Sequence, residues 1–178
     1  ASDLQILACA NAFDGALADE RAEGMGYRAY LVDVSAQASD ESSYHVRRQT
    51  VGIPEIGSDY ETQSVFAHEA LLDLTQGIDF KKGCYVGQEV VSRVGHRSTA
   101  RKRFVKIACE IALPEWGSDI IVDGRSVGGL GSSSGTRGLA LVRVDKLSGP
   151  SVHVGDQTAE LAVPSFASFQ LGSAEIDG

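Results

Sequence analysis

The sequence predicts a mixed α+β protein in which a helix-containing first half precedes a small antiparallel β-barrel. Up to about residue 98, short apolar segments of strand type alternate with helix-type segments and polar loops. From residue 99 onward, short strand-type segments follow one another closely and are separated by glycine-rich turns, which is typical of small barrels. We therefore expect two domains, 1–98 and 99–178, which meet within a basic stretch.

The first half contains two expected strands and one expected helix. Residues 4–12 are apolar and end at a turn, and residues 27–34 are rich in strand-forming side chains. Residues 39–51 are expected to form a helix that Ser39 or Asp40 caps and that Gly52 and Pro54 terminate.

Two shorter segments complete the first half. Residues 68–74 are apolar and predict one or two helical turns, and residues 77–80 predict a brief strand. His68 has no neighbouring His or Cys in the sequence, so we expect a structural histidine rather than a metal ligand.

The second half contains five expected strands, which Gly- and Ser-rich turns separate. They cover residues 104–109, 120–122, 126–130, 139–144 and 160–163. Cys109 lies among apolar neighbours on the first of them and is expected to be part of the core.

The stretch 81–93 carries a cysteine in a charged, glycine-flanked setting. Lys81 and Lys82 precede Cys84, and a short helix is expected over residues 86–94. A cysteine at the start of a helix beside lysines is expected to have a lowered pKa and therefore more thiolate. The alternative is that Cys84 is simply a small packed residue in a loop before an amphipathic helix.

Residues 82–89, Lys-Gly-Cys-Tyr-Val-Gly-Gln-Glu, resemble the signature of the YgfZ group of folate-binding proteins. These are relatives of the glycine-cleavage T protein, an aminomethyltransferase, and they include a mitochondrial iron–sulfur assembly factor. Residues 47–55 and 66–73 look like the same family, so the resemblance covers most of the chain. With the family in view, the functional interpretation of Cys84 is favoured over packing.

The resemblance also implies a fold and a ligand. The chain would be the second half of a T-protein-like fold, with a ferredoxin-like α+β domain followed by a β-barrel. The family's N-terminal domain would lie upstream, and it would be needed to complete a cavity for tetrahydrofolate. Cys84 would be the reactive group and Lys82 would help to hold it charged, while Tyr85, Gln88 and Glu89 would shape the folate site.

Two further residues are candidate folate contacts. Tyr44 lies where relatives carry an aromatic residue that faces the pterin, and a tyrosine can stack on a flat heterocycle. Ordinary half-buried packing of Tyr44 on a helix face is an equally open alternative. Arg48 is expected to meet either the glutamate tail of folate or the protein's own acids, and the second role is the safer expectation.

Three functions are therefore in competition. The first is a folate-binding accessory factor for the assembly or maintenance of iron–sulfur proteins, with those proteins or their assembly machinery as partners. The second is an aminomethyltransferase that moves a one-carbon unit to tetrahydrofolate, so whether the protein is an enzyme stays open. The third is a binding module in which Cys84 only packs.

Composition and charge narrow the class of protein. The 178 residues carry 24 acids and 16 bases, a net charge of −8, which argues against general nucleic-acid binding. The three cysteines are widely spaced and predict neither a disulfide framework nor a metal site. No apolar run approaches the roughly 20 residues needed to span a membrane. A reducing compartment fits best, the cytoplasm or, in a eukaryote, the mitochondrial matrix.

Overall fold

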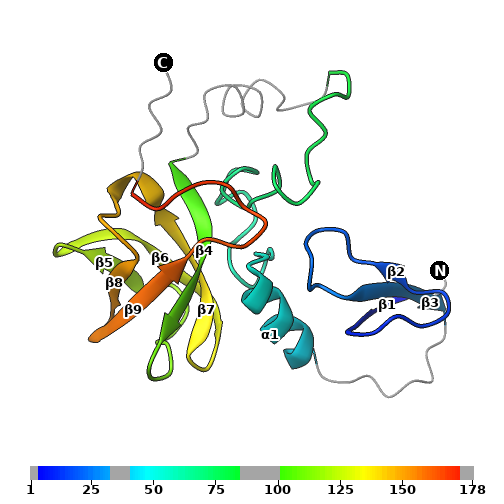
Figure 1. Ribbon diagram of the computed structural model, residues 1–178, viewed down its shortest axis with the longest axis horizontal. Helices are drawn as coiled ribbons and strands as arrows, with labels where there is room; N and C mark the ends of the chain where they lie inside the picture. The colour runs from blue at the N-terminus through cyan, green and yellow to red at the C-terminus, as the bar shows by residue number, and fades with distance from the viewer. Residues whose placement is uncertain (1–3, 33–40, 85–100, 173–178) are drawn as a thin grey trace.

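The structure is a computed structural model of the chain, and it describes residues 4–32, 41–84 and 101–172. These residues form a closed β-barrel in the second half, and a three-stranded sheet and one α-helix in the first half (Figure 1). The expected α+β class with a small antiparallel barrel is therefore confirmed. The expected boundary between residues 98 and 99 lies outside the described residues and stays a prediction.

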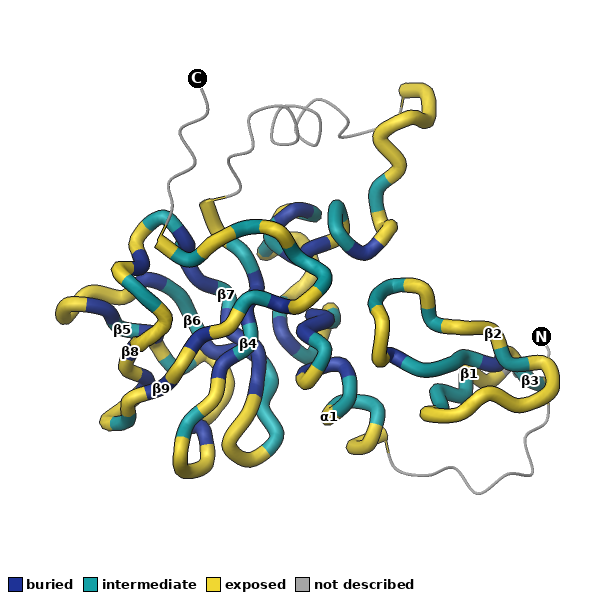
Figure 2. Tube along the Cα trace, viewed as in Figure 1, coloured by how far each residue is buried: buried dark blue, intermediate teal, exposed yellow. Residues whose placement is uncertain are grey.

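The N-terminal sheet is antiparallel and small. Its strand order is β1-β3-β2, with bounds β1 (Leu4–Cys9), β2 (Leu17–Ala18) and β3 (Tyr27–Val32). The two longer strands were expected from their apolar, strand-forming residues, whereas β2 was not, because two residues carry too little pattern to recognise. Figure 2 shows that this sheet has few buried residues compared with the barrel.

The single described α-helix, α1 (Ser42–Val51), ends where the sequence predicted. Gly52 adopts φ +104°, and its N–H donates to the Arg48 carbonyl at 2.8 Å, a left-handed C-cap that glycine adopts without strain. A Cβ added to Gly52 would lie 2.7 Å from Pro164, so the helix end also lies close to the C-terminal part of the chain.

The start of α1 differs from the prediction. Glu41 stands at the N-cap and makes no side-chain cap hydrogen bond, and the first turn contains no acid. The expected caps, Ser39 and Asp40, lie outside the described residues. Along its length α1 lies against β6 and β7, so the helix covers one side of the barrel (Figure 1).

The barrel closes in the order β4-β7-β6-β5-β8-β9, with every neighbouring pair antiparallel. Its strands are β4 (Lys102–Cys109), β5 (Asp119–Val122), β6 (Arg125–Ser134), β7 (Arg137–Arg143), β8 (Ser151–Val154) and β9 (Gln157–Ala162), and the 3-10 turn η1 (Val144–Lys146) follows β7. All five expected strands are present. The strand β8 was not expected, although its Ser-Val-His-Val residues alternate outward and inward as a strand requires.

The barrel core consists of alternate residues from each strand. Val105 and Ile107 on β4 face the same interior as Val152 and Val154 on β8, and all four are buried. A second, smaller cluster joins Leu71 from the first half to barrel residues Phe104 and Leu139, so the two halves share apolar contacts. Burial of this kind contributes roughly 25 cal/mol per Å² of apolar surface removed from water.

The segment between α1 and the barrel forms successive turns and no strand. Residues 68–74 form hydrogen-bonded turns that are not continued as a helix, because Leu71 adopts φ +61°. The strand expected at residues 77–80 was wrong. The Gly77 N–H bonds back to the Leu72 carbonyl at 2.8 Å. The Asp79 carboxylate accepts the backbone N–H groups of Lys81 and Lys82 at 2.8 and 3.2 Å. These local bonds curl the chain, which is the usual effect of an Asp side chain on a turn.

Candidate functional site

The Cys84 thiol lies at the end of this curled segment and is exposed to solvent. In Figure 1 the segment that leads to Cys84 extends away from the barrel and from the N-terminal sheet. Lys82 is also exposed, and its backbone is fixed by Asp79. Tyr85, Gln88, Glu89 and the helix expected over residues 86–94 lie outside the described residues, so their roles stay predictions.

Arg103 on β4 anchors the segment that carries Cys84. Its Nη1 donates to the His68 carbonyl at 2.6 Å and lies 2.8 Å from both carboxylate oxygens of Asp73. The Arg103 guanidinium also lies 5.6 Å from the centroid of the Phe169 ring, a cation–π distance. The Phe104 N–H adds a bond to the Glu69 carbonyl at 3.1 Å. The turns before Cys84 are therefore tied to a barrel strand.

His68 is buried beneath this segment. Only 3% of its surface is exposed, its ring lies 6.2 Å from that of Phe80, and its Nε2 has no hydrogen-bond partner among the described residues. Burial lowers the pKa of His68; the Asp73 charge opposes this effect and the Arg103 charge adds to it. His68 is therefore held as the neutral imidazole.

Arg48 forms a buried clamp between α1 and the barrel, which we call the Arg48 clamp and define as Arg48, Asp59 and Ser132. The guanidinium is fully buried. Its Nη1 pairs with Asp59 and donates to the Ile53 carbonyl at 3.2 Å, and its Nη2 donates to the Ser132 hydroxyl at 2.9 Å. Arg48 thus meets the protein's own acids, the second of its two expected roles. It would reach a folate tail only if the clamp opened.

Ser132 is the residue on which the clamp converges. Its Oγ accepts from Arg48 and from the Gln49 amide, both at 2.9 Å, and donates to Asp59 Oδ1 at 2.7 Å. A hydroxyl has one donor and two acceptor positions, so all three are used. The preceding Gly131 makes room, because a Cβ there would lie 2.8 Å from Asp59 Oδ1.

Tyr44 belongs to a second polar network, which joins α1 to the N-terminal sheet. Its hydroxyl donates to Glu55 at 3.1 Å and accepts from Arg21 Nη2 at 3.4 Å. Arg21 in turn bonds both carboxylate oxygens of Asp19, at 2.9 and 2.7 Å, and Arg28 lies 2.9 Å from the same carboxylate. The tip of Tyr44 is therefore already engaged, while the stacking of its ring on a pterin stays a prediction.

Asp19 is held ionised by this network. Burial acts to raise the pKa of Asp19, but the hydrogen bonds and charge of Arg21, together with the charge of Arg28, outweigh it and leave the pKa below its ordinary value. Arg28 therefore forms an ion pair within the protein.

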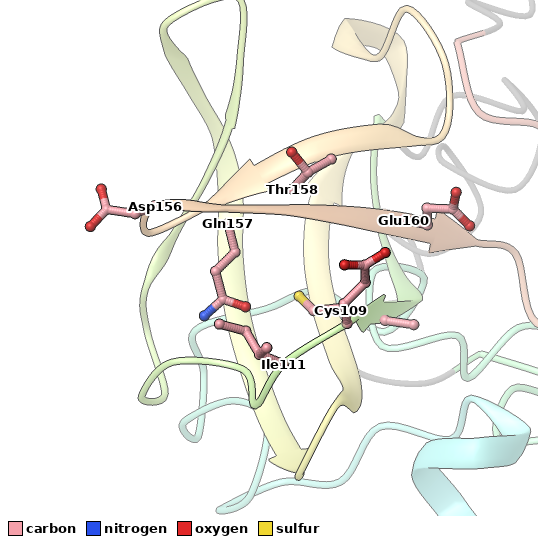
Figure 3. A pocket seen from close by; sticks show the side chains of 8 residues that line it. Cys109, Ile111, Asp156, Gln157, Thr158 and Glu160 are labelled. Carbon is pink, nitrogen blue, oxygen red and sulfur yellow. The ribbon is translucent and has the colours of Figure 1, made fainter.

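The other two cysteines are less accessible than Cys84. Cys109 is half-buried and packs against the barrel core as expected, and it also lines a groove of about 670 Å³ beside Gln157 and Glu160 (Figure 3). Burial raises the pKa of Cys109. Cys9 is half-buried and its Sγ donates to the Tyr27 carbonyl at 3.5 Å. Exposure thus singles out Cys84 among the three thiols.

Within the described ranges, no three His, Cys, Asp or Glu side chains are grouped so as to hold a metal ion. The same part of the chain contains no helix with the length and apolar character needed to cross a membrane.

Sequence reasoning missed the partners that complete the polar networks. Asp59 and Ser132 are 73 residues apart in the chain, and neither stands in a motif. The Gly- and Ser-rich segment around Ser132 belongs to β6 and not to a turn between barrel strands.

Comparison with known proteins gives a consistent set of relatives. Residues 101–169 match the family described as CAF17, C-terminal beta-barrel domain. The mouse protein "Iron-sulfur cluster assembly factor IBA57, mitochondrial" is 31% identical over 155 residues, which cover 80% of this chain and 43% of the mouse protein. The human protein of the same name is 30% identical, with 82% and 44% covered. An IBA57 homolog from Neurospora crassa is 38% identical over 58% of this chain and 26% of its own. The chain thus spans less than half the length of each of these relatives.

Proposed function

Because the chain belongs to the family of the IBA57 iron–sulfur cluster assembly factors and carries the CAF17-type barrel, we propose that it serves in the assembly or maintenance of iron–sulfur proteins. The observation that supports this role best is the exposure of Cys84, at the end of a segment tied to the barrel by Arg103. The relatives are named as mitochondrial, so the mitochondrial matrix is the proposed compartment in a eukaryotic source.

Cys84 is the residue that we assign to contact with a cluster or with a partner protein. Thiolate is the soft ligand that suits iron in clusters. Lys81 and Lys82 both precede Cys84 and are exposed, so they add positive charge to the surface around the sulfur.

Replacing the sulfur of Cys84 tests this role. In cells that lack the endogenous protein, full-length protein with Cys84→Ser is expected to leave iron–sulfur enzymes inactive, whereas Cys109→Ser is expected to restore them. Both variants should accumulate to the wild-type level, because neither thiol is fully buried. Full restoration of iron–sulfur enzymes by Cys84→Ser would contradict the proposal.

We also propose that tetrahydrofolate binds near Cys84. It is supported by the resemblance of residues 82–89 and by the position of Tyr44, with Tyr85, Gln88 and Glu89 as the further proposed contacts. Calorimetry of the full-length protein with tetrahydrofolate is expected to show saturable binding that Tyr44→Ala weakens. No binding to the wild-type protein would exclude folate while leaving the role of Cys84 open.

A further inference from the structure

A pocket of about 420 Å³ lies between the loop at residues 57–61 and the outer side of the barrel. Trp116, the chain's single tryptophan, lines this pocket with 55% of its surface exposed. Tryptophan is among the residues most enriched where proteins bind one another, because it offers a large apolar face at little cost in conformational entropy. An exposed tryptophan in a concave site is therefore a candidate contact for a partner.

Two glutamates make the charge of the pocket negative. Glu61 and Glu115 both line it and both are exposed. Neither carboxylate has an ion pair or a side-chain hydrogen bond among the described residues, in contrast to Asp19, Asp59 and Asp73. None of the described residues that line the pocket is Lys, Arg or His. The remaining polar groups of its lining are mainly serine hydroxyls.

The walls of the pocket are held in place by the barrel. On one side, the turn that carries Trp116 is bonded to β6 twice, from Gly117 N–H to the Leu130 carbonyl and from Leu130 N–H to the Ser118 carbonyl, both at 2.8 Å. On the other side, the Ser132 hydroxyl is fixed by its three hydrogen bonds with Arg48, Gln49 and Asp59. A pocket that is formed before binding pays little ordering cost when a ligand enters.

We propose that this pocket binds a basic side chain, an arginine or a lysine, which a partner protein presents. A guanidinium or ammonium group attracts both the face of an indole ring and a carboxylate, and Trp116, Glu61 and Glu115 offer these together. An anionic ligand would meet two uncompensated negative charges. This inference does not depend on the function of Cys84, and it assigns an interaction surface to the barrel.

The test is a titration of the ¹⁵N-labelled chain with a short peptide, acetyl-Gly-Arg-Gly-amide, followed by NMR. The same peptide with citrulline in place of arginine is neutral and nearly the same shape. The arginine peptide is expected to shift the single indole N–H signal and the amide signals of Gly131 and Ser133 in a saturable way. The citrulline peptide is expected to leave them unchanged.

Two double variants separate this pocket from general attraction to an acidic protein of net charge −8. Glu61→Gln with Glu115→Gln is expected to weaken binding at least about threefold, since exposed ion pairs contribute little each but act together. Glu110→Gln with Glu160→Gln removes two exposed acids from the other groove, and it is expected to leave the affinity unchanged. Equal shifts with the citrulline peptide, or equal weakening by both double variants, would overturn the proposal.

Discussion

At the scale of single residues, the Ser132 hydroxyl uses its whole hydrogen-bonding capacity, with one donated and two accepted bonds. Its partners Arg48 and Gln49 are buried, and such groups are costly to leave unpaired. Sequence alone did not identify Ser132, because a serine in a glycine-rich strand has no distinguishing pattern.

Ser132→Ala is expected to destabilise the fold by about 1–3 kcal/mol, because it removes the acceptor for two buried donors. Ser134→Ala, on the same strand, is the matched control, since the Ser134 hydroxyl makes no hydrogen bond within the described residues. Denaturant unfolding of both variants measures the difference. Equal stability of the two would show that the clamp contributes nothing measurable.

His68 predicts a pH dependence of stability. The unfolded chain takes up a proton at His68 near the ordinary pKa of about 6.5, whereas burial keeps the folded imidazole neutral to lower pH. The unfolded state therefore binds more protons below about pH 6.5, so stability is present above that pH and is lost as the pH falls.

His68→Gln removes this titration. The free energy of unfolding of the wild type is expected to fall more between pH 7.5 and 5.5 than that of His68→Gln, whatever the absolute stability of the variant. An identical pH dependence in the two proteins would mean that the pKa of His68 is the same in the folded and unfolded chain and that its environment is not as described.

At the scale of elements, the sequence was informative wherever local chemistry decides the structure. The five expected barrel strands and the C-terminal end of α1 were confirmed, because alternating apolar residues and a Gly-x-Pro stop act locally. The two-residue strand β2 and the four-residue strand β8 were missed, since such short elements are specified mainly by the strands they pair with. The strand expected at residues 77–80 failed because the Asp79 side chain turned the chain instead.

The close approach of Gly52, at the end of α1, to Pro164 predicts a loss of stability when a side chain is added, and Gly57 provides the matched control. Gly52→Ala is expected to cost about 2 kcal/mol or more, because it combines a positive φ with a Cβ placed 2.7 Å from Pro164. Gly57→Ala has a similar positive φ, +81°, but meets nothing within 4 Å, so only the backbone cost of about 1 kcal/mol applies. Thermal unfolding compares them, and an equal loss would argue against the contact with Pro164.

At the scale of the whole molecule, the Arg48 clamp and an apolar cluster join the two halves of the chain, and the Tyr44 network joins two elements of the first half. The Arg48 clamp ties α1 to β6, the Tyr44 network ties α1 to the N-terminal sheet, and Leu71 packs on Phe104. The sequence indicated that acids of the protein would pair with Arg48. It gave no means of identifying Ser132, a partner 84 residues away. Pairings at such separations follow from the assembled fold and not from any local pattern.

The surface of the whole molecule determines which side chains other molecules can reach. The resemblance of residues 82–89 identified Cys84, and the structure adds that its thiol is exposed while the other two thiols are half-buried. The candidate site was therefore identified from the family resemblance and not from composition or spacing, because a lone cysteine forms no motif with a defined spacing.

The most direct test of the account is the rate at which each cysteine of the folded protein reacts with limiting iodoacetamide at pH 7, read by mass spectrometry of the digested protein. Cys84 is expected to be alkylated first, several-fold faster than Cys9 and Cys109, because its thiol is exposed while the other two are half-buried. Alkylation of Cys84 no faster than that of Cys9 and Cys109 would contradict the central claim.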